Sequence, residues 1–131
     1  MSIKPVTRIT TAYNVALVTV DNLPNNMDLI SDIFNQVAKK NINIDMISQA
    51  PPYKGSVNLS FSIPSDDLVT AISTLNEFKS KVPNLLIEVD ASNTKISVYG
   101  EGMKNLPGVA AKLFTILAGQ NIEVKLVTTS E

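Results

Sequence analysis

The chain of 131 residues contains no cysteine and no histidine. The absence of cysteine excludes disulfide bonds and thiolate chemistry. The absence of histidine removes the commonest general base and a common metal ligand, so any catalysis would depend on carboxylates or lysines. The usual residues of an enzyme active site are therefore missing.

The chain also lacks long runs of one kind of residue. The net charge is -1 and no run of basic residues exists, which argues against electrostatic binding to nucleic acid. No apolar run approaches the length that crosses a membrane, and the N-terminal segment lacks the apolar stretch of a secretory signal. We therefore expect a cytoplasmic protein that binds neither nucleic acid nor membranes.

What is present is the composition of a globular protein. Hydrophobic residues make up 44% of the chain and charged residues 18%, which is enough apolar surface to build a core. The length suits one ordinary domain or two very small ones. Two domains of half this size would each be marginally stable, because small domains bury too little apolar surface. We therefore expect a homodimer.

The first two thirds of the chain predict an α+β fold of the ferredoxin-like kind. Apolar residues at helical spacing predict a helix at 29–37, and Ser65 is the expected N-cap of a second helix. The clearest strand is 57–63, where odd-numbered apolar residues are expected to point inward and even-numbered polar residues outward. Further strands are predicted at 15–20, 42–48 and 85–89. The order β-α-β-β-α-β predicts an antiparallel four-stranded sheet with both helices on one face.

A second, shorter unit follows, with strands predicted at 95–100 and 122–127 and a helix between them. At an offset of 80 residues, Phe34 is matched by Phe114 and Asn41 by Asn121. We interpret this match as a duplicated small domain, although any two strand–helix units share some apolar spacing. The short β-branched run at 6–10 lies outside the first unit, and we expect it to join the sheet of the second unit beside 95–100.

Four segments resemble, in order along the chain, the paired ACT domains of aspartokinases. "VTRIT" is similar to the strand that follows the catalytic region of that family. "NINIDMISQ" and "VNLSFSIPSDDL" resemble the first ACT domain, and "LPGVAAKLFTILAGQNIEVKLVTTSE" resembles the second. The resemblance implies ferredoxin-like ACT domains in tandem. Residues 11–92 would form the first, and residues 1–10 with 93–131 a second that is incomplete at its C-terminal end.

The resemblance implies a regulatory module with no catalytic site of its own. Aspartokinases phosphorylate aspartate with ATP on the route to lysine, threonine and methionine, and their ACT domains bind lysine or threonine to switch the catalytic domain off. The lysine- and glycine-rich signature of that catalytic domain is not found here. ATP and magnesium would therefore belong to the kinase domain, and no cofactor is expected in this chain. The expected partners are a second copy of the chain, a lysine or threonine effector, and the catalytic domain of the parent protein.

The resemblance also implies an effector site. Such a site needs free backbone N–H groups at a helix start for the ligand's carboxylate, and acceptors for its ammonium. Ser60 falls where changes in the family affect feedback sensitivity. The residues that match the site are Asn25, Asp28, Leu29, Ile30 and Gln49 in the first domain, and Ala110, Glu123 and Val124 on the facing wall of the second.

Some of these positions depart from the family. Met27-Asp28 stands where the family has Pro-Gly, so that Asp28 brings a negative charge to the place where a carboxylate would dock. We interpret Asp28 as an N-cap or first-turn residue of a normal helix in preference to a ligand contact, whereas Gln49 could equally be a solvated residue at a strand end. Leu106-Pro107-Gly108 matches the family better, but it also fits an ordinary helix start. The carboxylates of Asp28 and Glu123 favour lysine over threonine.

Two functions from different classes remain open at this point. The first is an amino-acid-binding regulatory module of an aspartokinase. The second is a structural or dimerisation module of the same family that has lost its ligand. A small hydrolase of ferredoxin-like fold is a distant third, because it would need an anion-binding arginine and the only arginine is Arg8.

Overall fold

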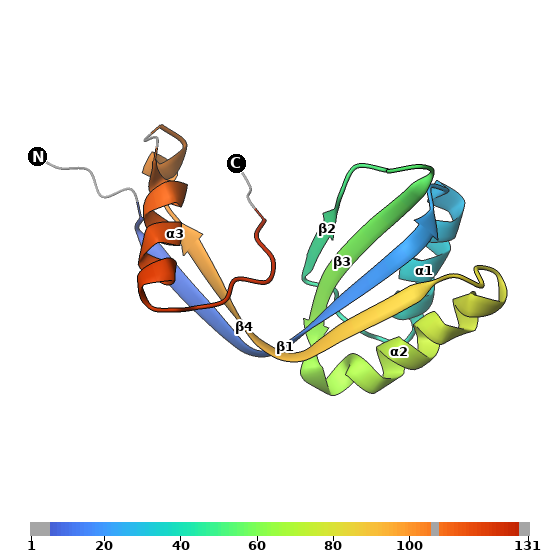
Figure 1. Cartoon of the computed structure of the whole chain (residues 1–131). Helices are drawn as coiled ribbons and strands as arrows, with labels where there is room; N and C mark the ends of the chain where they lie inside the picture. The colour runs from blue at the N-terminus through green and yellow to red at the C-terminus, as the bar shows by residue number, and fades with distance from the viewer. Residues whose placement is uncertain (1–5, 106–107, 129–131) are drawn as a thin grey trace, which may run out of the picture. The chain divides into compact units, whose positions relative to one another are not determined.

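The computed structural model describes residues 6–105 and 108–128. The chain forms two compact units, which we call the larger unit (Ala12–Lys95) and the smaller unit (Met1–Thr11 with Ile96–Glu131). Figure 1 shows the chain and its element labels. The elements are β1 (Arg8–Pro24), α1 (Met27–Lys39), β2 (Met46–Gln49), β3 (Ser56–Pro64), α2 (Leu68–Asn76), β4 (Leu86–Tyr99) and α3 (Val109–Gly119), with 3-10 turns at Ser65–Asp67, Glu77–Ser80 and Glu101–Asn105.

The larger unit has the predicted ferredoxin-like architecture. Its strands lie in the order β2-β3-β1-β4, and β3 is antiparallel to both β1 and β2. Helices α1 and α2 cover the same face of this sheet (Figure 1). The prediction of an antiparallel α+β fold with its helices on one face is confirmed.

The core of the larger unit lies between the sheet and these two helices. The four odd-numbered residues predicted to point inward from β3 are buried, each with at most 1% of its surface exposed. Phe61 packs edge-on against Phe34 of α1, with the ring centroids 5.7 Å apart. Each such side chain contributes about 1.5–3 kcal/mol when it is buried, so this layer stabilises the unit strongly. The buried apolar residues of the strands are Ala16, Val18, Val20, Leu23, Val57, Leu59, Phe61 and Ile63.

Three details of the predicted pattern are wrong. Ser62, expected to point outward into solvent, is only 2% exposed, because it lies in the middle of the sheet and its Oγ accepts a hydrogen bond from Met46 N–H at 3.1 Å. Ser65 does not cap α2. Its Oγ donates instead to the backbone carbonyl of Ala91 at 2.7 Å, and a 3-10 turn precedes the helix. The strand predicted at 42–48 is also shorter than expected, since β2 begins only at Met46.

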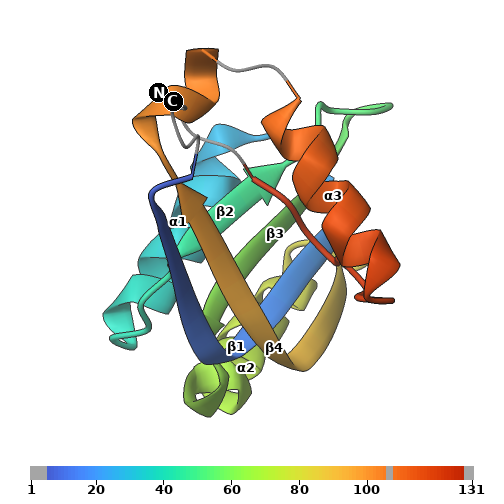
Figure 2. The same cartoon turned by 90° about the vertical axis from the view of Figure 1, so that its left-hand side faces the viewer.

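Two strands continue from the larger unit into the smaller one. The strands predicted separately at 85–89 and 95–100 are one strand, β4, and β1 is likewise long enough to serve both units. In the smaller unit, Thr7 N–H donates to Tyr99 O at 2.9 Å, and the Arg8 guanidinium lies 5.2 Å from the centre of the Tyr99 ring. Figure 2 shows β1 and β4 side by side with α3 next to them. The predicted pairing of 6–10 with 95–100 is confirmed.

The last predicted strand, 122–127, does not form. Residues 122–128 have no secondary structure, and the Ile122 N–H turns back to Leu117 O at the end of α3. The segment has the alternating pattern of a strand, but a strand is stable only when its backbone groups are paired with a neighbour. In the part that the structure describes, the smaller unit therefore consists of the ends of β1 and β4, one 3-10 turn and α3.

Candidate functional site

The start of α1 is held by the residue before the helix. Asn26 is the N-cap, with extended backbone (φ -134°), and its side-chain oxygen accepts hydrogen bonds from Asp28 N–H at 2.9 Å and Leu29 N–H at 3.3 Å. Ile30 N–H donates to the Asn26 carbonyl at 3.1 Å. Two backbone donors of the first turn, Asp28 N–H and Leu29 N–H, are thus already bonded within the protein and are not free to meet a ligand's carboxylate.

Asp28 is therefore a first-turn acid and does not cap the helix. A carboxylate at this position is favoured by the helix dipole. The capping role considered for Asp28 belongs to Asn26, which the comparison with the family motif left out. An asparagine directly before an apolar helical pattern is the signal that could have identified it, because Asn is among the preferred N-caps.

The two residues after Asp28 point towards the core rather than to the surface. Ile30 is only 4% exposed, and Leu29 is half-buried against the same cluster. Asn25 is exposed, and its backbone N–H donates to Gly55 O at 3.0 Å, which ties the loop to the turn between β2 and β3. Of these three residues, only Asn25 has a side chain directed at solvent.

Gln49 lies at the same end of the sheet as the start of α1. β2 and β1 both run antiparallel to β3, so their C-terminal ends, with Gln49 and the loop after Pro24, lie at the same end of the sheet. Gln49 is directly opposite Leu59, whose side chain faces the helices, so the exposed Gln49 side chain projects from that face as well. The structure thus brings Gln49 and the start of α1 to one end and one face of the sheet, with β3 between β2 and β1.

Ser60 lies on the opposite face of the sheet. It is paired in register with Ser48 of β2 and Thr19 of β1, and its Oγ is 3.0 Å from Thr19 Oγ1. This row of three hydroxyl groups crosses the sheet away from α1. The position matched to feedback sensitivity therefore does not contact the helix start.

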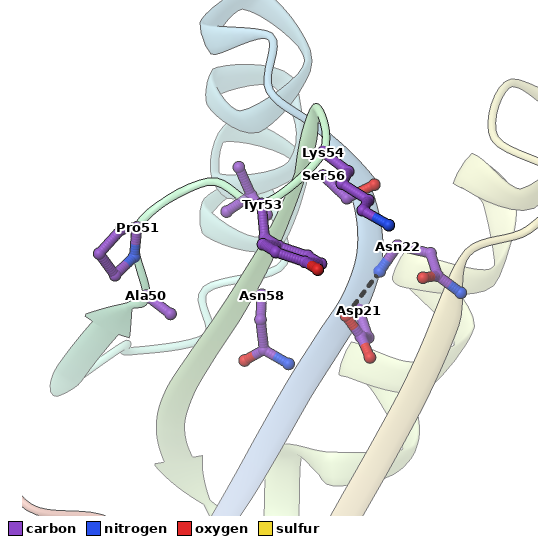
Figure 3. A pocket seen from close by; sticks show the side chains of 9 residues that line it. Asp21, Asn22, Ala50, Pro51, Tyr53, Lys54, Ser56 and Asn58 are labelled. Carbon is purple, nitrogen blue, oxygen red and sulfur yellow. Dashed lines mark hydrogen bonds between the residues drawn. The ribbon is translucent and has the colours of Figure 1, made fainter.

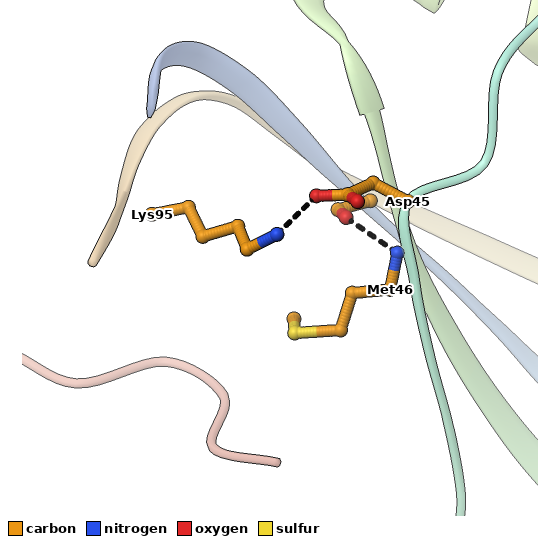
Figure 4. Close-up of polar contacts among 4 residues, drawn as sticks. Asp45, Met46 and Lys95 are labelled. Atoms are coloured by element: carbon orange, nitrogen blue, oxygen red, sulfur yellow. Dashed lines mark hydrogen bonds and ion pairs between the residues drawn. The ribbon is translucent and has the colours of Figure 1, made fainter. Parts of the chain in front are cut away.

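An ion pair lies beyond the other end of β2. Lys95 Nζ contacts Asp45 Oδ2 (Figure 4). The next residue along the chain, Met46, donates its backbone N–H to Ser62 Oγ. The side chains of Lys95 and Asp45 are 31% and 51% exposed, so water screens their attraction. The pair connects β4 to the start of β2.

The other candidate residues belong to the smaller unit. Ala110 is in the first turn of α3, and Glu123 and Val124 follow the helix. All three are exposed. Gly108 is the N-cap of α3 with φ of 86°, whereas Leu106 and Pro107 lie outside the described residues. A closed site that requires both units stays a prediction.

Comparison with known families matches the ACT domain over residues 18–78 and 96–131. The chain belongs to the ACT domain family. An aspartokinase of Bacillus sp. (strain MGA3) is 43% identical over 117 residues, which cover 89% of this chain and 28% of that protein. The ACT units therefore span less than a third of the length of this curated relative.

Solved structures that resemble this chain also come from aspartokinases. A crystal structure of aspartokinase alpha and beta subunits is 33% identical, with a TM-score of 0.82, and the match covers 95% of this chain and 82% of that one. The regulatory subunit of aspartate kinase from Thermus thermophilus, 23% identical with a TM-score of 0.84, has the same fold. The resemblance to the regulatory region of aspartokinases is confirmed.

Neither a metal centre nor a membrane-spanning helix is found in the described part of this chain. Within residues 6–105 and 108–128, no three acidic side chains gather as metal ligands would. No helix in those ranges is both long and apolar enough to cross a bilayer.

Proposed function

We propose that the chain is the regulatory module of an aspartokinase, which pairs with a second copy and passes an amino-acid feedback signal to the kinase domain. The ACT match and the aspartokinase relatives support this function. The transfer of phosphate from ATP to aspartate would belong to the remainder of the parent protein, because this chain corresponds to 28% of the relative's length.

The main observation in favour of a homodimer is that the smaller unit lacks a buried core in the part that the structure describes. In the described part of this unit no residue is buried, although α3 is rich in apolar side chains. Apolar side chains that stay exposed in a small unit are a common mark of an interface. The largest of them are Ile9, Ile96, Tyr99, Phe114, Ile116, Ile122, Val124 and Val127, each at least 41% exposed.

The proposed effector is lysine, bound at the start of α1 in the larger unit. Asp28 forms no ion pair with any residue that the structure describes, so its carboxylate is available to a ligand's ammonium. Gln49 projects from the same face and could contact the ligand. The ligand's carboxylate would have to displace the Asn26 side chain from the N–H groups of the first turn, which predicts weak binding.

The Asn26 cap of α1 also favours a second function, which is dimerisation without a ligand. The Asn26 side chain already bonds two of the donors at the helix start, so the larger unit does not need an effector to satisfy these two groups. The two functions differ in one measurable property, which is the binding of a free amino acid at the start of α1.

Calorimetric titration of the whole chain with lysine, threonine and methionine separates the two functions. Asn26→Gly frees the first-turn N–H groups at a cost of only a few tenths of a kcal/mol, and Asp28→Gly removes the charge that repels the ligand's carboxylate. Asn26→Gly should tighten lysine binding by roughly tenfold, the value of one hydrogen bond to a charged group. Asp28→Gly also removes the acceptor of the lysine side-chain ammonium, so it should tighten the binding of threonine and methionine and abolish the preference for lysine. Asp32→Asn, farther along α1, is the charge control and should bind like the wild-type chain.

No heat with lysine for the wild-type chain and for both glycine variants would reject the effector function and leave the dimerisation function. Binding of threonine but not lysine would reject only the choice of ligand.

A further inference from the structure

A hollow of about 330 Å³ lies on the larger unit, separate from the start of α1. Its walls are the end of β1 at Asp21 and Asn22, the β2–β3 connection at Tyr53 and Lys54, and Asn58 at the start of β3. Figure 3 shows α1 behind the sheet and these side chains in front of it, so the hollow opens on the face away from the helices. Its size is at the lower end of the range for small-molecule sites.

A bulge in β1 shapes one wall of the hollow. The β1–β3 register shifts between Val20 and Leu23, so that Asp21 and Asn22 together oppose the single residue Asn58. Asn22 has a left-handed backbone with φ of 59°, and its N–H donates to Asp21 Oδ1 at 2.8 Å. Bulges change the direction in which side chains point, and they are over-represented beside functional sites.

A tight turn shapes the opposite wall. Tyr53 and Ser56 exchange two backbone hydrogen bonds of 2.9 and 3.0 Å, and the two residues between them, Lys54 and Gly55, have φ of 51° and 78°. Two positive φ values define a type I′ turn, in which Asn, Asp or Gly is preferred at the first position. Lys54 therefore occupies a position that disfavours it, and residues that break a local rule are most often found at functional sites.

The two walls carry opposite charges that are not paired with each other. Neither Asp21 nor Lys54 forms a salt bridge with any residue in the described ranges. The Tyr53 ring is 73% exposed beside them, with Lys54 Nζ 5.4 Å from its centre. Asn58, which also lines the hollow, adds an amide that can donate and accept.

We propose that this hollow is a second small-molecule site, which takes a free α-amino acid in its zwitterionic form. Asp21 receives the ammonium, Lys54 receives the carboxylate, and the ligand's side chain lies along the Tyr53 ring. A carboxylate and an ammonium that line one hollow match the two charged groups of one amino acid, and each contact is a charge-assisted hydrogen bond. The site does not depend on the proposed effector site at α1, which uses a different face of the unit.

Two-dimensional ¹H–¹⁵N NMR of the whole chain, titrated with L-lysine, L-threonine and L-methionine, tests the proposal. At least one of these amino acids should shift the backbone amides of Asp21, Lys54 and Asn58 along a single saturation curve. The amides of Leu29 and Gln49 report separately on the α1 site. Asn25 is excluded as a reporter, because its N–H is bonded to the turn at Gly55.

Two variants separate a ligand contact from a structural role. Asp21→Asn should weaken binding at this site by roughly tenfold or more, the value of a hydrogen bond to a charged group. Lys54→Asn should weaken it to the same extent while leaving Tm unchanged or raised, because it creates the Asn-Gly pair that type I′ turns prefer. Lys81→Asn removes a lysine that lies over Phe78, outside this hollow, and should leave binding unchanged.

Three results would overturn the proposal. The first is shifts confined to Leu29 and Gln49, which would show binding at the α1 site alone. The second is the absence of any amide shift with all three amino acids. The third is a Lys54→Asn variant that binds as tightly as the wild-type chain.

Discussion

Replacement of Asn26 by alanine tests the account of the α1 start. The change removes two hydrogen bonds to the helix, one of 2.9 Å from Asp28 N–H and a longer one of 3.3 Å from Leu29 N–H. Loss of an N-cap side chain costs about 0.5–2 kcal/mol, and we expect about 1 kcal/mol because one of the two bonds is long. For a domain as small as the larger unit (Ala12–Lys95), a loss of this size lowers Tm by about 4–8 °C.

Urea denaturation followed by circular dichroism measures this change in unfolding free energy. Asn26→Asp keeps a capping oxygen and should be as stable as the wild-type chain. Asn25→Ala is the neighbouring control, because the Asn25 side chain forms no hydrogen bond among the described residues. If Asn26→Ala and Asn25→Ala have the same midpoint, Asn26 does not cap α1 and the reason given for weak effector binding is wrong.

Three further predictions concern the core, the ion pair and the interface. Phe61→Ala should lower the unfolding free energy by about 3–5 kcal/mol in the same assay, because the ring is fully buried against Phe34; a loss below 1 kcal/mol would contradict the core assignment. Lys95→Met should cost no more than about 1 kcal/mol, and 1 M salt should remove the difference, since its ion pair with Asp45 is exposed. Ile116→Asp, at a side chain 55% exposed, should convert a dimer to a monomer in light scattering, and an unchanged mass would exclude α3 from the interface.

The fold of the larger unit could be predicted because its local signals agree with its tertiary packing. The strict alternation in β3 and the helical spacing in α1 both survive, since the apolar residues that they specify meet in one core. The exposure of Ser62 could not be predicted in this way. Alternation shows only which side of a sheet a residue faces, and Ser62 is buried because β2 and its Met46 N–H lie beside it.

The smaller unit shows the opposite limit. The pattern of 122–127 is that of a strand, but its backbone finds no ladder in the structure, and a sequence pattern does not specify a partner. The candidate site was only partly predictable for a related reason. The family motif identified the helix start at Asp28 and the strand end at Gln49, but the state of the N–H groups there depends on Asn26, which lies outside the matched positions.

The pairing of Thr7 with Tyr99 has a consequence for how the chain folds during synthesis. These two residues are 92 positions apart, and translation at about 5–20 residues per second separates them by roughly 5–20 s. During that interval residues 7–11 have been made but their partners in β4 have not. The larger unit has all its residues once Lys95 is made, so it can fold first, and the smaller unit can close only when the last quarter of the chain emerges from the ribosome.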